Sequence, residues 1–257
     1  MNSSPVLSAQ NVSVAFGSSQ VTFGVSFDIF AGEFFALVGE SGSGKSVTSM
    51  GMLGLLPKPS AKVISGEVLF EGKDLLKMSV SELRQIRGKK ISVIFQEPMQ
   101  ALDPVRTIRS QLREAIPETP KKEAFEKMHS LLKSAGFADP DRVLNAYPCE
   151  MSGGMLQRVC IVMALLPGPQ IIIADEPTTA LDVTVQAAVL AVLKRMAQDA
   201  GTAVLLITHN MGLVAQYTNR VAVMYQGRIV ETGKSRDVIE NPQDSYTKKL
   251  IAAIPNG

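Results

Sequence analysis

The octapeptide Gly39–Ser46, with the sequence GESGSGKS, is the feature that most restricts how this chain can fold. It satisfies the pattern G-x-x-x-x-G-K-[S/T], in which glycines permit positive φ and let backbone N–H groups converge on phosphate oxygens. The apolar run Phe34–Val38 before it predicts a buried strand. A helix is expected to begin near Lys45, and its N-terminus adds a partial positive charge. The segment therefore predicts a strand, a phosphate-binding loop and a helix, in that order.

Individual roles follow from this pattern. Lys45 is expected to reach the β- and γ-phosphates of a nucleotide, and the Ser46 hydroxyl is expected to bind Mg²⁺. The alternative is a glycine-rich turn with an incidental lysine, which the preceding strand disfavours. The residues predicted to contact the nucleotide in this segment are Gly39, Glu40, Ser41, Gly42, Ser43, Gly44, Lys45, Ser46 and Val47.

A second apolar run, Ile171–Ala174, ends in two acids, Asp175 and Glu176. A buried parallel strand delivers its last residues to the carboxyl edge of the sheet, where a phosphate-binding loop also lies. Asp175 is placed to support Mg²⁺ through water, and Glu176 to orient or deprotonate the attacking water. The alternative is a solvated acidic turn at a strand end.

The remaining patterns predict an α/β fold. Short apolar runs suit strands covered on both faces, and apolar spacing of about 3.6 residues predicts an amphipathic helix. Ser79 and Glu82 form a candidate capping box for a short helix ending at Arg87. The expected parallel strands are 34–38, 91–95, 171–174 and 203–207, the helix is 185–196, and weakly alternating residues 6–9, 12–16 and 25–29 predict an antiparallel layer.

Composition limits the function classes. Lys and Arg number 26 against 24 Asp and Glu, without a concentrated basic face, so no nucleic-acid partner is expected. The short cluster Arg87–Lys90 is better explained as a solvated turn. Met1–Pro5 lacks the features of a signal peptide, and the apolar stretches are too short to span a bilayer. Cys149 and Cys160 lack metal-type spacing and are expected to be reduced, buried thiols.

The segment Met151–Met155, with the sequence MSGGM, resembles the signature of ABC ATPases, which is usually Leu-Ser-Gly-Gly-Gln. It precedes the acid-tipped strand, as in that family. The resemblance implies a P-loop NTPase (RecA-like) core with an N-terminal antiparallel β layer and an inserted helical sub-domain. The implied ranges are 1–96 and 156–232 for the core, 97–155 for the helical sub-domain and 233–257 for a C-terminal tail.

The resemblance also implies roles for further residues. Ser152, Gly153 and Gly154, before an apolar helix expected from Leu156, would press onto ATP held by the opposite subunit. The family's Q-loop glutamine matches Gln96, a ligand of Mg²⁺ and water. Its switch histidine matches His209, which would contact the γ-phosphate.

Two further residues, Asp182 and Phe16, match positions of the family. In the D-loop segment Thr179–Asp182, Asp182 would help to align the two subunits. Phe16 matches the aromatic residue that stacks on adenine, although an alternating strand would also carry a Phe at this position in the core.

Closer inspection indicates a subgroup. Several segments resemble those of the ATPase subunits of bacterial dipeptide, oligopeptide and nickel importers. They are the phosphate loop, Phe95–Met99, Met155 and the tail Asn241–Thr247. Many of those continue into a cysteine-bearing extension beyond the position of Gly257, and the short form resembles the nickel or metal-chelate branch. This predicts an ATPase that uses ATP and Mg²⁺ to drive uptake of peptides or metal chelates.

The expected partners are a second ATPase subunit (a paralogue or the same chain), two transmembrane permease subunits and, indirectly, an extracytoplasmic substrate-binding protein. The expected location is the cytoplasmic face of the inner membrane. An ABC ATPase outside transport and a P-loop small-molecule kinase are the rival interpretations. The kinase would have no use for a signature segment.

Overall fold

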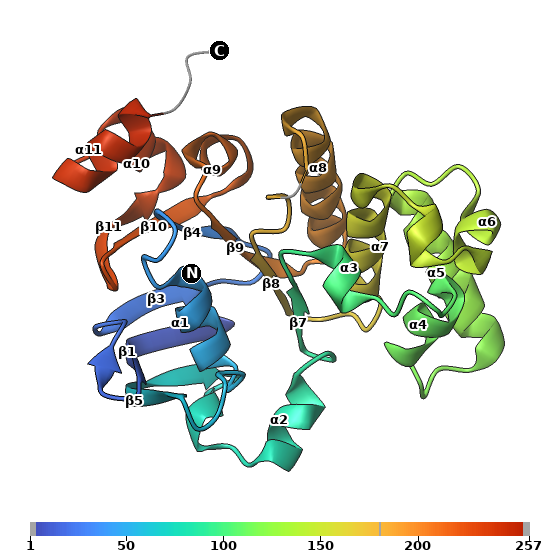
Figure 1. The fold of residues 1–257 in the computed structure, drawn as a ribbon, viewed down its shortest axis with the longest axis horizontal. Coiled ribbons are helices and arrows are strands. Elements are labelled where there is room, and N and C mark those ends of the chain that lie inside the picture. Colours follow the sequence, from blue (N-terminus) through green and yellow to red (C-terminus); the bar gives the residue numbers. More distant parts are fainter. Residues whose placement is uncertain (1–3, 180, 254–257) are drawn as a thin grey trace. The chain divides into compact units, whose positions relative to one another are not determined.

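A computed structural model describes residues 4–179 and 181–253. The described residues form two compact units, one from residues 4–84 and 203–253 and the other from residues 85–179 and 181–202. Figure 1 labels most of the helices and strands of each unit. Ala180, part of the predicted D-loop segment, lies outside the described residues.

The first unit contains an antiparallel layer of β1 (Leu7–Phe16), β2 (Ser19–Gln20), β3 (Val25–Ile29), β5 (Ala61–Phe70) and β6 (Lys73–Asp74). The expected layer is therefore confirmed, but two details differ. The expected strands 6–9 and 12–16 are one strand that begins at Leu7 and bulges where Asn11 adopts φ 52°. The ten-residue strand β5, which pairs with β1, had no expected counterpart. Its burial alternates only over the last four residues, so most of the strand lacks the period-two pattern.

The first unit also contains a mixed sheet in the order β11-β10-β4-β9. The strand β4 (Phe34–Val38) is parallel to β9 (Ala203–Thr208) and to β10 (Arg220–Tyr225). The hairpin partner β11 (Arg228–Lys234) is antiparallel to β10. Every residue of β4 and β9 is buried, as the continuous apolar runs predict. The sheet therefore has a fully buried centre whose carboxyl edge carries the predicted loop.

Helices complete the first unit: α1 (Lys45–Met52), α9 (Met211–Tyr217), α10 (Ser235–Glu240) and α11 (Ser245–Ala252), with the 3₁₀ turn η1 (Leu75–Lys77). The helix α2 (Val80–Ile86) opens with the predicted capping box. The Ser79 N–H donates to Glu82 (2.8 Å), and the Glu82 N–H donates to the Ser79 hydroxyl (3.3 Å). The prediction at this helix start is confirmed.

The second unit contains the parallel pair β7 (Ile91–Ile94) and β8 (Ile171–Asp175). Its helices are α3 (Pro98–Ala101), α4 (Ile108–Glu114), α5 (Lys121–Ser134), α6 (Pro140–Asn145), α7 (Gly153–Leu165) and α8 (Val183–Asp199), with the 3₁₀ turn η2 (Pro148–Glu150). Helical structure between 98 and 155 agrees with the helical character expected there. The predicted boundary after residue 155 falls within α7.

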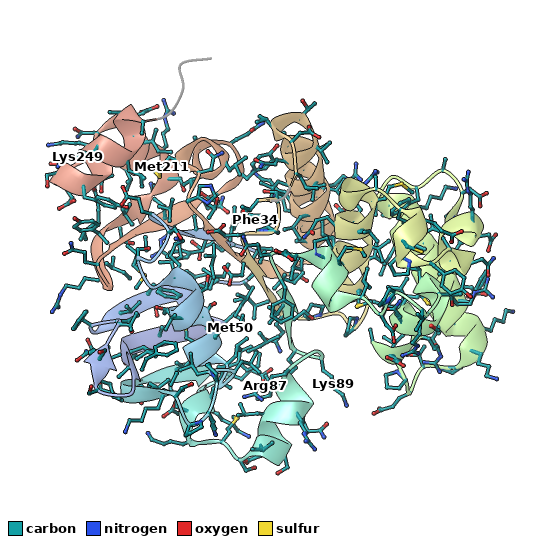
Figure 2. All side chains as sticks on the ribbon, viewed as in Figure 1. Phe34, Met50, Arg87, Lys89, Met211 and Lys249 are labelled. Carbon is teal, nitrogen blue, oxygen red and sulfur yellow. The ribbon has the colours of Figure 1, made fainter. Side chains whose placement is uncertain are left out.

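Figure 2 shows the side chains of both units as sticks. Phe34 and Phe35 of β4 are among the largest fully buried side chains. Burying a large apolar side chain contributes about 2 kcal/mol, so these runs contribute strongly to the stability of the sheet. Residues 88–90 form a turn of exposed residues, with Gly88 at φ 73°, as predicted for the cluster 87–90, whereas Arg87 is half-buried.

Candidate nucleotide site

The predicted phosphate loop lies between β4 and α1 in the first unit. Gly42 and Gly44 adopt φ 80° and 102°, a conformation in which glycine is strongly favoured. Gly39 is required for a different reason. A Cβ at this position would lie 2.1 Å from the Met224 carbonyl oxygen, so the end of β10 packs directly against the start of the loop.

Lys45 is the first residue of α1, and its side chain is almost completely buried. Its Nζ donates to the carbonyl oxygens of Gly39 and Glu40, both at 2.8 Å. Burying an ammonium group is costly unless such acceptors are present. The lysine is thus held within the loop by backbone carbonyls. Ser46, the next residue, is exposed on the first turn of α1, while Val47 is half-buried.

The strand register brings His209 to the same sheet edge as the loop. Val38 pairs with Thr208 in the parallel β4–β9 ladder, so Gly39 and His209 are the next residues on neighbouring strands. The His209 side chain is exposed there. The two motifs are far apart in sequence, and the register confirms that they share one edge.

In the second unit, a parallel ladder likewise brings two predicted residues to one edge of the strands. Ile94 pairs with Ala174 in the parallel β7–β8 ladder, and Gln96 and Asp175 follow these positions. Both line a cavity of about 470 Å³ together with Phe95, Glu97 and Ala101. Asp175 is buried at the end of β8. The structure therefore brings together two of the predicted oxygen ligands.

Glu176 has an unusual backbone. It adopts φ 45°, a left-handed conformation that is uncommon for residues other than glycine and costs of the order of 1 kcal/mol or more. Its carboxylate Oε2 accepts a hydrogen bond from the Thr179 hydroxyl at 2.8 Å. The Glu176 side chain is half-buried in this turn.

The signature segment differs from the expectation in one respect. The helix was expected from Leu156 after two flexible glycines, but α7 begins at Gly153, with Ser152 as its N-cap. The Ser152 hydroxyl accepts the Met155 N–H at 3.4 Å. The glycines are helical, and a Cβ on Gly154 would lie 2.6 Å from Val185 of α8. Close helix packing therefore accounts for Gly154.

The structure also shows the surroundings of two other predicted residues, Asp182 and Phe16. Asp182 is the N-cap of α8, and its carboxylate accepts the Val185 N–H at 3.0 Å. Phe16 ends β1 with 36% of its side chain exposed. The alternative of Phe16 as a core residue is therefore wrong, while its contact with adenine stays a prediction.

Sequence reasoning missed several residues that support the loop. The Gly227 N–H donates to the Ser43 carbonyl at 3.0 Å. The Tyr246 hydroxyl accepts the Glu40 N–H at 2.9 Å. These residues belong to the β10–β11 turn and to α11, and no local pattern marks them as neighbours of the loop. The resemblance of the tail 241–247 to a known group was the only available signal.

The chain is similar to proteins of one known family. The profile of the ABC transporter family matches residues 22–179. The dipeptide transport ATP-binding protein DppD of Bacillus subtilis is 50% identical over 97% of this chain and 77% of its own length. The oligopeptide transport ATP-binding protein OppD of the same organism is 44% identical over 97% and 72%, respectively.

Solved structures agree with both sequence comparisons. The ATP-binding cassette MJ0796, a dimer in a post-hydrolysis state bound to ADP and Pi, superposes with a TM-score of 0.76 at 28% identity, covering 90% of this chain and 99% of that one. The cbiO1 protein of Clostridium perfringens, part of the cbiONQ transporter complex, gives 0.82 at 23% identity, covering 98% and 97%, and supports the fold. The chain belongs to the ABC transporter family, as an ATP-hydrolysing subunit.

Proposed function

We propose that this chain binds ATP and Mg²⁺, pairs with a second ATPase subunit, and uses hydrolysis to drive peptide import through membrane permeases. The observation that carries the proposal is the buried Lys45 held by two carbonyls of a loop that also has the phosphate-binding sequence. The names of the relatives, which are dipeptide and oligopeptide transport proteins, support peptides as the substrate. A nickel or metal-chelate substrate is the alternative.

The loop explains how phosphates would be held. The backbone N–H groups of residues 42–46 and the N-terminus of α1 provide a site for anionic oxygens. Lys45 would exchange the carbonyls of Gly39 and Glu40 for β- and γ-phosphate oxygens. Because those carbonyls already hold the ammonium in place, little side-chain entropy remains to be lost on binding.

The available oxygen ligands fit Mg²⁺. In nucleotide sites this ion keeps several waters and is bound by one or two protein oxygens plus phosphates. Ser46 offers an exposed hydroxyl, and Gln96 and Asp175 line one cavity. Among the described residues, no group of three or more Asp, Glu, His or Cys side chains is placed to hold a metal ion. When bound, the ion would neutralise developing phosphate charge.

Glu176 is the proposed base. Its left-handed backbone and the hydrogen bond from Thr179 fix the carboxylate, which would accept a proton from, or orient, the attacking water. His209 and Gln96 would contact the γ-phosphate and the water. Fixed geometry at this position is consistent with strain stored at a functional site.

The second half of the site would come from another molecule. Ser152 and Gly153 are exposed at the start of α7, next to the buried Gly154, and Asp182 would help to align the partner. The partner is a paralogue or a second copy of this chain. Dimerisation around ATP followed by opening after hydrolysis would supply the movement.

The membrane part would come from other chains. Among the described residues, no helix is both long and apolar enough to cross a membrane. This chain would lie at the cytoplasmic face of the inner membrane. There its segment 97–104 would contact the permease subunits, of which two are expected. An extracytoplasmic binding protein would deliver the substrate to those permeases.

The test is the substitution Glu176→Gln. It keeps the shape of the side chain but removes the base, so ATP should still bind while turnover falls at least about 100-fold. Size-exclusion chromatography with ATP and Mg²⁺ should show accumulated dimers. Glu240→Gln, at an exposed ion pair with Arg236, is the matched control and should keep normal turnover. Normal hydrolysis by Glu176→Gln would exclude the proposed base.

A further inference from the structure

Tyr246 links the C-terminal helix α11 to the phosphate loop. Its hydroxyl oxygen accepts the N–H of Glu40 at 2.9 Å. The carbonyl of the same peptide unit, that of Gly39, accepts Lys45 Nζ at 2.8 Å. In a trans peptide the C=O and N–H point in opposite directions. Lys45 and Tyr246 therefore hold one peptide plane from its two sides.

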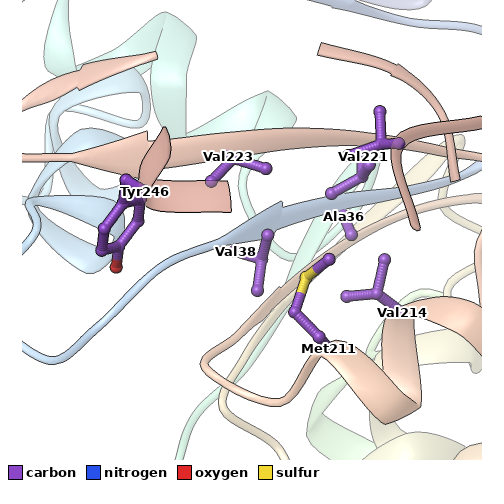
Figure 3. Close-up of a cluster of buried hydrophobic side chains, with 8 residues drawn as sticks. Ala36, Val38, Met211, Val214, Val221, Val223 and Tyr246 are labelled. Atoms are coloured by element: carbon purple, nitrogen blue, oxygen red, sulfur yellow. The ribbon is translucent and has the colours of Figure 1, made fainter. Parts of the chain in front are cut away.

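The phenol is firmly held in its place. Tyr246 is buried, and its ring stacks on Tyr225 with a centroid distance of 4.1 Å. It lies at one end of a cluster of buried side chains (Figure 3). The cluster includes Val38, the last residue of β4, and Val223 of the neighbouring strand β10. Burial raises the pKa of the Tyr246 phenol, so the accepting oxygen is that of a neutral hydroxyl at physiological pH.

The helix that carries Tyr246 is itself anchored. The Asp244 carboxylate caps α11 by accepting the Tyr246 N–H at 2.7 Å. The Glu231 carboxylate on β11 accepts the N–H groups of Gln243 and Asp244, at 2.9 and 3.1 Å. The Tyr246 hydroxyl is thus held on the same sheet that carries the loop, with little freedom to move.

We propose that Tyr246 is a positioning residue for nucleotide binding, which fixes the Gly39–Glu40 peptide when Lys45 leaves it for phosphate. The inference rests on the proposed role of residues 39–46. Lys45 holds the peptide only while no phosphate competes for its ammonium. Once Lys45 has moved, the Tyr246 hydroxyl is the contact that keeps the peptide from rotating, so the loop keeps the shape that receives the phosphates.

The test is Tyr246→Phe, which keeps the ring, its stacking on Tyr225 and the burial, and removes only the accepting oxygen. The matched control is Tyr225→Phe. Its hydroxyl accepts a hydrogen bond from Gln226 at 3.2 Å. Binding of a fluorescent ATP analogue and of ADP, ATPase kinetics and hydrogen–deuterium exchange are measured for each.

For Tyr246→Phe we expect the Kd for both nucleotides to rise about fivefold, in line with the net worth of one hydrogen bond. The KM for ATP should rise by a similar factor, and kcat at saturating ATP should change less than about twofold. Exchange should become faster in the peptide containing Glu40 and stay unchanged in β10 and α9. The control should match the unmodified protein in every measurement.

Unchanged affinity in Tyr246→Phe would overturn the inference. So would a general loss of thermal stability with faster exchange throughout the first unit, because that pattern means a structural role only. The variant Lys45→Ala distinguishes a failure of the proposed phosphate loop from a failure of the proposal for Tyr246. If it binds ATP normally, the proposed phosphate loop itself fails. If it loses ATP while Tyr246→Phe keeps full affinity, the inference about Tyr246 fails alone.

Discussion

At the scale of single residues, the proposed site uses side chains whose environment differs from that of an ordinary surface residue. Lys45 is buried and bound by carbonyls, Glu176 is held in a left-handed turn, and Asp175 is buried at a strand end. Their types and spacing could be predicted from the sequence. Their burial and backbone angles could not, because these depend on neighbours such as Met224 that are remote in the chain.

The two cysteines illustrate the same point. Both were expected to be buried, but Cys149 is exposed and only Cys160 is buried. Burial raises the pKa of the Cys160 thiol from 9.0 to about 12. Reactive thiols are thiolates that reagents can reach, so Cys160 should be inert in the folded protein.

We predict that iodoacetamide at pH 8 labels Cys149 of the native protein, and labels Cys160 only after unfolding, as counted by mass spectrometry. The control Cys149→Ser should take up no label while folded. Labelling of Cys160 at a similar rate in the native state would contradict its burial.

The raised pKa also predicts a pH dependence. Between about pH 9 and 12 the unfolded chain loses the Cys160 proton while the folded chain keeps it, so the free energy of unfolding falls as pH rises. Urea unfolding at pH 8 and at pH 10.5 should show a smaller decrease in Cys160→Ala. Burial also raises the pKa values of Tyr217 and Tyr246, whose effect has the same sign and is common to both proteins.

At the scale of elements, α7 places two demands on its N-cap residue. Ser152 caps the helix and is also the proposed contact with a partner's ATP. Alanine would remove both properties. Aspartate would keep the cap, because its carboxylate accepts N–H groups as well as serine does, but it would repel phosphate.

We therefore predict that Ser152→Ala lowers the free energy of unfolding by about 1 kcal/mol. Ser152→Asp should stay within about 0.5 kcal/mol of the unmodified protein and yet lose at least about tenfold in ATPase activity. Urea unfolding and steady-state hydrolysis check these values. An active Ser152→Asp protein would exclude phosphate contact at this helix end.

At the scale of the whole molecule, the proposed site is divided between two copies or two paralogues. A chain with Lys45→Ala keeps its signature residues, and one with Ser152→Asp keeps its phosphate loop. If the chain pairs with itself, a mixture of the two variants assembles some dimers with one complete site.

We expect each variant alone to be nearly inactive and an equimolar mixture to recover up to about a quarter of normal ATPase activity. This estimate follows from half of the random pairs having one of two sites intact. The control mixture combines Lys45→Ala with a chain carrying both substitutions and should stay inactive. With the ATPase activity of the unmodified chain established on its own, lack of recovery in the first mixture would argue against a shared site.

The sequence alone determined the local parts of this protein. The loop 39–46, the acid pair after the apolar run 171–174 and the continuous strands could be identified because each depends on neighbouring residues and on burial of a whole run. The capping box at Ser79 belongs to the same group. All of these follow from backbone geometry and apolar periodicity within about ten residues.

The tertiary structure decided what depends on distant residues. It joined β1 into one bulged strand, paired it with the unexpected β5, and began α7 at Gly153 through the Ser152 cap. It also brought Tyr246 to the loop across more than two hundred positions of the chain. Such contacts arise from the packing of whole elements, and no local pattern encodes which distant hydroxyl will meet a given N–H.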